Sequence, residues 1–235
     1  MHVEGCRAGT ELFSDTLQWV ADQRRAHPVL RYLDALTWDL KPRLDTWLAD
    51  YVGAEDTDHS RLVGRKWLIA AVRRVRQPGT KFDNMLVLEG PENLGKSMVF
   101  EKLASSDWFT DNLRMGDDAK VVIENTAGKW IVEIAEMEGM SRRDVETTKS
   151  FVSRQVDCAR AAYGRFANEV PRQFVLGATT NDAQYLISRT GNRRFWCVTA
   201  GTLDTVGLSC GRRQQQPRLM ASLASARRLP DRVPA

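Results

Sequence analysis

Apolar residues in the first third of the chain recur every three or four positions, the spacing of an amphipathic helix. Four such stretches precede the dipeptide Pro78-Gly79, a strong stop signal for regular structure. Their recurring positions are Leu12, Thr16, Leu17 and Val20; Val29, Leu33 and Leu36; Leu44, Leu48 and Tyr51; and Leu62, Leu68, Ala71, Val72 and Val75. We therefore expect residues 1–78 to be a helical N-terminal region, either a small subdomain or helices that only pack on the core.

Beyond Pro78-Gly79 the pattern changes to short continuous apolar runs, which are typical of strands buried on both faces. The runs cover residues 85–88, 130–134, 174–180 and 195–198. Helix-like stretches separate several of them, and the clearest of these extends from Ser141 to Val156. This alternation predicts an α/β fold with a parallel sheet, in a core of residues 79–208.

Composition and charge exclude only a few classes of protein. The 235 residues suffice for one large domain, and the net charge of +4 permits nucleic-acid binding without requiring it. The four cysteines form no CxxC pair, which argues against a zinc site or a disulfide framework and suits a cytoplasmic protein. No apolar run approaches the roughly 20 residues needed to cross a bilayer, so no membrane contact is predicted.

One motif has a specific chemical meaning. Residues 90–97 read Gly-Pro-Glu-Asn-Leu-Gly-Lys-Ser and match G-x-x-x-x-G-K-[ST] in full. The motif follows the apolar run 85–88 and precedes a stretch that can form a helix, which is the context that a P-loop requires. The sequence therefore predicts a site for ATP and Mg²⁺ at this loop.

Each residue type in the loop has a role in binding a triphosphate. Gly90 and Gly95 let backbone N–H groups turn inward around phosphate oxygens. Lys96 is expected to contact the β- and γ-phosphates, and Ser97 to offer its hydroxyl to Mg²⁺. Asn93 stands where many such loops have another glycine, and asparagine tolerates left-handed backbone better than most residues.

Two glutamates are candidates for the carboxylate that such a site needs near Mg²⁺. Glu133 and Glu136 come at the end of the run 130–134, so they are expected at the carboxyl end of a buried strand, beside the loop. One would hold Mg²⁺ and the other would orient the attacking water, and the sequence does not assign the two roles. Glu138 is a less favoured candidate, and either glutamate could instead be a solvated surface residue.

A polar residue follows a second predicted strand. Asn181 comes directly after the run 174–180. Its amide both donates and accepts, so it can bond the γ-phosphate or the attacking water. The alternative is a turn asparagine, because Asn-Asp favours turns.

Two adjacent arginines, Arg193 and Arg194, precede the run 195–198. An arginine contributed across a subunit boundary can stabilise the charge that develops in phosphoryl transfer. Paired arginines also occur as surface residues or phosphate contacts, and this alternative stays open.

Between Glu136 and Asn181 lies a basic segment with one aromatic residue. Its members are Lys149, Arg154, Arg160, Tyr163, Arg165 and Arg172. Basic side chains can neutralise a nucleic-acid backbone, and a tyrosine can stack on a base. We expect Lys149, Arg160, Tyr163 and Arg165 to contact single-stranded DNA; the alternative is a solvated helix face followed by a loop.

The order of these features resembles the superfamily 3 helicases of phages, plasmids and viruses. It is most similar to the virulence-associated protein E family of prophages and genomic islands. The resemblance extends over about residues 25–208. The matching residues are Pro28, Tyr32-Leu33, Trp38-Asp39, 78–81, 90–97, 128–136, 163–165, 171–173, 179–181 and 190–196.

The resemblance implies a P-loop ATPase core of the AAA+-like, superfamily 3 type, acting as a helicase in DNA replication of a mobile element. It also implies a homo-oligomeric ring, a hexamer, whose Arg193 or Arg194 reaches the neighbour's nucleotide. Two other classes share the loop. One is a P-loop kinase, for which we see no acceptor motif, and the other is a nucleotide-dependent DNA-binding switch with little turnover.

The last residues depart from the family pattern. Up to Leu208 the chain resembles the family, which would continue with acidic, tryptophan-bearing helices. Residues 209–235 instead form a basic tail rich in Arg, Ala, Ser, Gln and Pro, the composition that out-of-frame translation of a GC-rich gene produces. We expect a frameshifted terminus and a truncated copy with impaired activity; the alternative is a genuine tail that binds nucleic acid.

Overall fold

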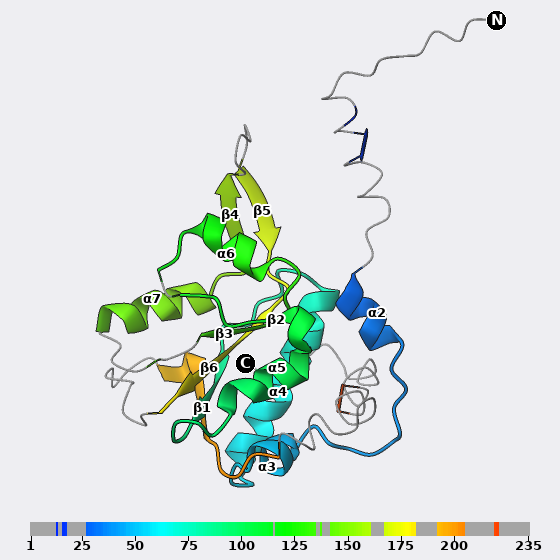
Figure 1. The fold of residues 1–235 in the computed structure, drawn as a ribbon, viewed down its shortest axis with the longest axis vertical. Helices are drawn as coiled ribbons and strands as arrows, with labels where there is room; N and C mark the ends of the chain where they lie inside the picture. Colours follow the sequence, from blue (N-terminus) through cyan, green and yellow to red (C-terminus); the bar gives the residue numbers. More distant parts are fainter. Residues whose placement is uncertain are drawn as a thin grey trace, which may run out of the picture.

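A five-stranded parallel sheet lies at the centre of the chain, with strand order β2-β3-β6-β1-β7, in the computed structural model (Figure 1). The structure describes residues 13, 16–17, 27–114, 116–134, 137, 142–160, 167–181, 192–204 and 219–220. The strands are β1 (Met85–Glu89), β2 (Phe109–Thr110), β3 (Ile131–Ile134), β6 (Val175–Thr180) and β7 (Phe195–Thr199). Because every neighbouring pair is parallel, the strands' carboxyl ends share one edge, the carboxyl edge, and their starts share the opposite amino edge.

Helices cover both faces of the sheet, because alternate residues of each strand point to opposite sides. In β1, Leu86 and Leu88 belong to one buried cluster, whereas Met85 and Val87 belong to the other. The first face is covered by α2 (Pro28–Asp34), α3 (Trp47–Val52), α4 (Asp58–Arg76) and α5 (Lys96–Ala104). The second face is covered by α6 (Ala119–Thr126) and α7 (Arg142–Val152).

The long helix α4 is bonded directly to the sheet. Trp67 Nε1 donates to Leu176 O at 2.8 Å, and Trp130 Nε1 donates to Ala71 O at 2.9 Å. Arg74, 1% exposed, donates to Phe174 O at 2.9 Å. Of the N-terminal region, the helices α2, α3 and α4 therefore pack on the sheet in one shared core, whereas most of the stretch expected around residues 12–20 lies outside the described residues.

A two-stranded antiparallel hairpin, β4 (Val156–Arg160) and β5 (Ala167–Pro171), stands outside the sheet and projects beyond α6 (Figure 1). Its base is held by Arg172, whose Nε and Nη2 donate to the two carboxylate oxygens of Asp157 at 2.6 and 2.7 Å. Arg172 Nη1 also donates to Phe151 O at 2.7 Å, so one side chain joins the hairpin to the end of α7. Both members of the ion pair are buried.

The predicted strands are confirmed, since the runs 85–88, 130–134, 174–180 and 195–198 become β1, β3, β6 and β7 of one parallel sheet. The helix expected up to Val156 is wrong at its end, because α7 stops at Val152 and Val156 begins β4, where it pairs with Pro171. Here pairing with a distant segment overrides local helical spacing.

No helix among the described ranges is both long and apolar enough to span a bilayer.

In the tail, Leu219 and Met220 are fully buried and belong to the cluster on the first face of the sheet.

Candidate functional site

The glycine loop, residues 90–97, connects the end of β1 to the start of α5 at the carboxyl edge. Asn93 has a φ of 57° and Gly95 a φ of 88°, so the loop turns through the left-handed region twice. Glycine adopts this region freely and asparagine more readily than most residues, which explains both residue types. Gly95 is the N-cap of α5 and supplies no side-chain cap, so the N–H groups of the first helical turn are directed toward the loop.

Lys96 bends back into the loop that it terminates. Its Nζ donates to Gly90 O at 2.6 Å, to Pro91 O at 2.8 Å and to Asn181 Oδ1 at 2.8 Å. The residue is only 6% exposed, so its positive charge is concentrated inside the loop. Asn181 directly follows β6, and β6 pairs with β1, which explains why the predicted amide lies beside the predicted lysine.

Ser97 lies beside the acidic residue of β3. Its Oγ donates to Glu133 Oε1 at 2.7 Å, and Thr179 Oγ1 donates to the same oxygen at 2.8 Å. Glu133 is completely buried, and its second oxygen, Oε2, has no hydrogen-bond partner within the described part of the chain. Buried carboxylate oxygens are normally satisfied, so this one marks a position for a group that the described residues do not supply.

The surroundings of Glu133 favour its protonated form. Burial raises the pKa of Glu133 above its ordinary value of 4.5, and the nearby charge of Asp111 raises it further. The hydrogen bonds from Ser97 and Thr179 and the charge of Lys96 lower the pKa and so oppose the shift. A cation placed at the unsatisfied oxygen would stabilise the ionised form.

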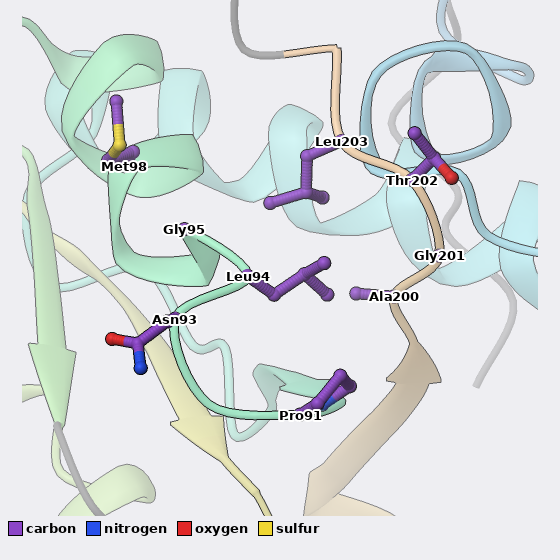
Figure 2. A pocket seen from close by; sticks show the side chains of 9 residues that line it. All are labelled: Pro91, Asn93, Leu94, Gly95, Met98, Ala200, Gly201, Thr202 and Leu203. Atoms are coloured by element: carbon purple, nitrogen blue, oxygen red, sulfur yellow. The ribbon is translucent and has the colours of Figure 1, made fainter.

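Two hollows flank the glycine loop. One, of about 500 Å³, is lined by loop residues 92–98 together with Thr179, Thr180 and Asn181. The other, of about 570 Å³, shares residues 93–95 and Met98 and is closed on its far side by residues 200–203 after β7 (Figure 2). Both are large enough for parts of a small ligand.

The two arginines lie far from their own glycine loop. They occupy a short 3-10 helix, Asn192–Arg194, directly before β7, whose first residue Phe195 pairs with Met85. They are therefore at the amino edge, roughly 16 Å from the loop at about 3.3 Å for each strand residue. Arg193 is exposed, whereas Arg194 is half-buried and its Nε donates to Ser153 Oγ at 2.9 Å.

The residues expected to contact DNA fall in three different settings. Lys149 is buried in α7, where its Nζ donates to Glu146 Oε1 at 2.7 Å, rather than on the solvated helix face that was the alternative to DNA contact. Arg160 ends β4, and only its backbone is described. Tyr163 and Arg165 lie outside the described residues, between β4 and β5.

Of the two candidate acids, the structure places Glu133 beside Ser97, whereas Glu136 and Glu138 lie outside the described residues. Within the described ranges, no three His, Cys, Asp or Glu side chains gather into a metal site of their own. Sequence reasoning missed Thr179 and Asp111. Thr179 could have been found from its place two residues before Asn181, and Asp111 from its place directly after the short strand β2.

Comparisons with known proteins agree with this architecture. Two solved structures of the NrS-1 C-terminal region without ligand are similar. The first, an A form, gives a TM-score of 0.57 at 13% identity, over 82% of this chain and 48% of that chain. The second, also an A form, of residues 305–718, gives 0.50 at 11% identity, over 82% and 46%.

This chain thus spans about half the length of those solved chains, and likeness at such low identity shows a shared fold alone. No curated protein matches the sequence. The family model of the virulence-associated protein E-like domain matches residues 33–223, which is most of the chain and continues past Leu208. The chain therefore belongs to the virulence-associated protein E-like domain family.

Proposed function

We propose that the chain is a P-loop ATPase with a superfamily 3, AAA+-like core, and that it acts as a helicase on DNA during replication of a prophage or another mobile element. One observation carries the proposal. Lys96, Ser97, Glu133 and Asn181 converge at the carboxyl edge from the glycine loop, α5, β3 and the end of β6. In parallel sheets this edge is where ligands bind, and the four side chains supply the groups that a triphosphate and a cation need.

Lys96 and the backbone of the loop bind the triphosphate. The ammonium now bonded to Gly90 O and Pro91 O would exchange these carbonyls for phosphate oxygens, which are stronger acceptors because they are charged. Asn181 accepts from Lys96, so it holds the ammonium in place and is itself close to the γ-phosphate position. There its amide group, whose Nδ2 donates to Glu92 Oε1 at 3.5 Å, would orient the attacking water.

The same edge fits Mg²⁺. Glu133 has an unsatisfied buried oxygen, and Ser97 has a hydroxyl within 2.7 Å of the other carboxylate oxygen. Hard oxygen donors of this kind suit Mg²⁺, which usually takes few protein ligands and completes its shell with water and phosphate. When bound, Mg²⁺ would neutralise charge on the β- and γ-phosphates. This assigns Glu133 to the metal side and leaves the water-orienting role to Glu136 or Asn181.

The arginines act on a neighbouring subunit in this proposal. At the amino edge, Arg193 and Arg194 cannot reach the glycine loop of their own chain, as the length of β7 separates them from it. In a homo-oligomeric ring, the amino edge of one subunit would face the carboxyl edge of the next. Arg193, which is exposed, is the residue suited to reach the neighbour's nucleotide, and Arg194 would position it through Ser153.

Stimulation of ATP hydrolysis by single-stranded DNA separates the three candidate classes. A helicase hydrolyses ATP faster when single-stranded DNA is added. A P-loop kinase shows no such stimulation, and a nucleotide-dependent binding switch shows little turnover with or without DNA. Absence of DNA-stimulated turnover, in protein shown to be folded and oligomeric, would contradict the proposal.

A further inference from the structure

The pocket of about 570 Å³ beside the glycine loop has mainly apolar side chains facing its centre (Figure 2). Leu94, Ala200 and Leu203 point toward one another across its centre. Asn93 and Thr202 carry the polar side chains among the described lining residues, and the polar ends of both point away from that centre. The described side chains that face the centre are therefore apolar, and any hydrogen bond that these lining residues offer there comes from backbone.

The pocket adjoins the phosphate site. The two hollows share residues 93–95 and Met98 in their walls, so they meet at the glycine loop. A nucleotide whose phosphates lie at Lys96 places its base within reach of the second hollow, since only the sugar separates the two parts. A flat aromatic base is also the part of a nucleotide that gains from apolar contact.

The far wall is held in position by α3. Gly201 N donates to Val52 O at 3.0 Å, and Asp204 N donates to Tyr51 O at 3.0 Å. The contact is close because both crossing residues are glycines: a Cβ on Gly201 would lie 2.3 Å from Gly53 O. Residues 200–204 thus form a pre-formed wall rather than a segment that must be ordered by the ligand, which lowers the cost of binding.

We propose that this pocket binds the base of a nucleoside triphosphate by apolar contact and discriminates weakly among bases, so that the chain accepts nucleoside triphosphates as a class. The inference rests on the proposed function. An apolar pocket distinguishes ligands of similar shape by about 10- to 200-fold, whereas a site built to hydrogen-bond one ligand rejects others by about 10⁴-fold or more. Among the described lining residues no polar side chain points to the centre of the pocket, so these walls are of the first kind.

A competition experiment tests the inference. ATP, GTP, CTP, UTP and inorganic tripolyphosphate, each with Mg²⁺, would displace a fluorescent ATP analogue from the wild-type chain. We expect the four nucleotides to agree within about tenfold, and tripolyphosphate to bind at least about tenfold more weakly because it has no base. A preference above about 100-fold for one base, or tripolyphosphate binding as tightly as ATP, would overturn it. If none of the five binds, the proposed function itself fails.

Variants of Leu203 place the base in this pocket. Leu203→Ala should weaken all four nucleotides by about five- to tenfold through lost apolar contact and leave tripolyphosphate unchanged. Leu203→Met, which conserves volume, should restore nucleotide affinity. Leu62→Ala, at a leucine 50% exposed on α4, is the matched control and should change neither. Equal affinities for ATP in Leu203→Ala and wild type, with both proteins folded by thermal unfolding, would refute this placement.

Discussion

Charged side chains are buried at both edges of the sheet, but their hydrogen-bonding states differ. Near the amino edge, Arg172 bonds both oxygens of Asp157 and the carbonyl of Phe151, so the buried pair is fully engaged. At the carboxyl edge, Glu133 accepts two hydrogen bonds on one oxygen, and its other oxygen has no partner among the described residues.

The difference distinguishes the Arg172–Asp157 pair, which maintains the fold, from Glu133, which is available to a ligand. The buried ion pair fixes the relative positions of α7 and the hairpin, because removing either partner would leave the other charge buried and unpaired. An unsatisfied buried carboxylate costs stability, and such a group persists where a ligand completes it. The two edges therefore predict opposite responses to substitution.

The largest expected effect concerns the exposed arginine at the amino edge. Arg193→Ala should keep ATP affinity and lower turnover by about 10³-fold or more, because an arginine supplied in trans stabilises the transition state rather than the bound nucleotide. Arg194→Ala is the neighbouring comparison and should lower turnover less, since Arg194 acts through Ser153. Steady-state turnover and ATP binding would be measured on both variants.

The trans role also requires wild-type turnover to rise steeply with protein concentration, as subunits assemble. Turnover that does not depend on concentration, in a demonstrated monomer, would reject it. Loss of ATP affinity in Arg193→Ala would equally contradict a role confined to the transition state.

The satisfied ion pair should contribute mainly to stability. Arg172→Met should lower the free energy of unfolding by about 3–5 kcal/mol, because it leaves the Asp157 charge buried and unpaired. Adding Asp157→Leu to this variant should recover part of the loss, since both charges are then gone. Urea denaturation measures both. Arg61→Ala, which breaks the exposed Arg61–Asp56 pair, is the control and should leave stability nearly unchanged. If the double variant is as unstable as Arg172→Met, the unpaired charge of Asp157 is not the cause of the lost stability.

The unsatisfied carboxylate should behave in the opposite way. Glu133→Gln should raise the free energy of unfolding of the nucleotide-free chain by roughly 0.5–2 kcal/mol and abolish turnover. The substitution removes the cost of burying a negative charge, and in the proposed function that charge holds Mg²⁺. Glu124→Gln on the exposed side of α6 is the matched control and should alter neither quantity. A Glu133→Gln variant that is less stable than wild type would contradict the comparison.

The pH dependence of stability follows from the same side chain. Because the pKa of Glu133 is raised on folding, the folded chain binds this proton more tightly than the unfolded chain does. The resulting stabilisation is complete below the ordinary value of 4.5 and is lost as the pH rises through the folded-state pKa. Relative to Glu133→Gln, the wild type should therefore lose stability as the pH rises above 4.5.

Much of the sheet could be predicted from the sequence because its strands are buried on both faces. A strand such as β1 is continuously apolar and ends in a motif whose residue types are fixed by phosphate chemistry. The closeness of Asn181 and Glu133 to the loop also followed from the sequence, since the carboxyl ends of parallel strands share one edge.

The hairpin and the arginine positions could not be predicted in the same way. Val156–Arg160 carries polar residues and pairs with a segment beyond its own turn, so local spacing gave a false extension of α7. The burial of Lys149 depends on which side of α7 faces the sheet, and the helix has few apolar residues to indicate it. The contact of Arg194 with Ser153 joins residues far apart in sequence.

The frameshifted tail stays a prediction. The family match extends to residue 223, and Leu219 and Met220 are buried, so part of this segment carries residues suited to a core. Reading the other frames of the gene just past the codon for Leu208 is the test. If no other frame continues with acidic, tryptophan-bearing helices, the truncation hypothesis fails.

The central claim is that residues 90–97 bind a triphosphate, and Mg·ATP affinity in Lys96→Ala tests it most directly. Each charge-assisted contact of this ammonium contributes roughly 1.5–3 kcal/mol, so its removal should weaken binding by about 100-fold or more. Lys102→Ala, at the other end of α5, is the matched control and should bind Mg·ATP as the wild type does. Equal Mg·ATP affinity in Lys96→Ala and the wild type, measured by titration calorimetry, would contradict the account.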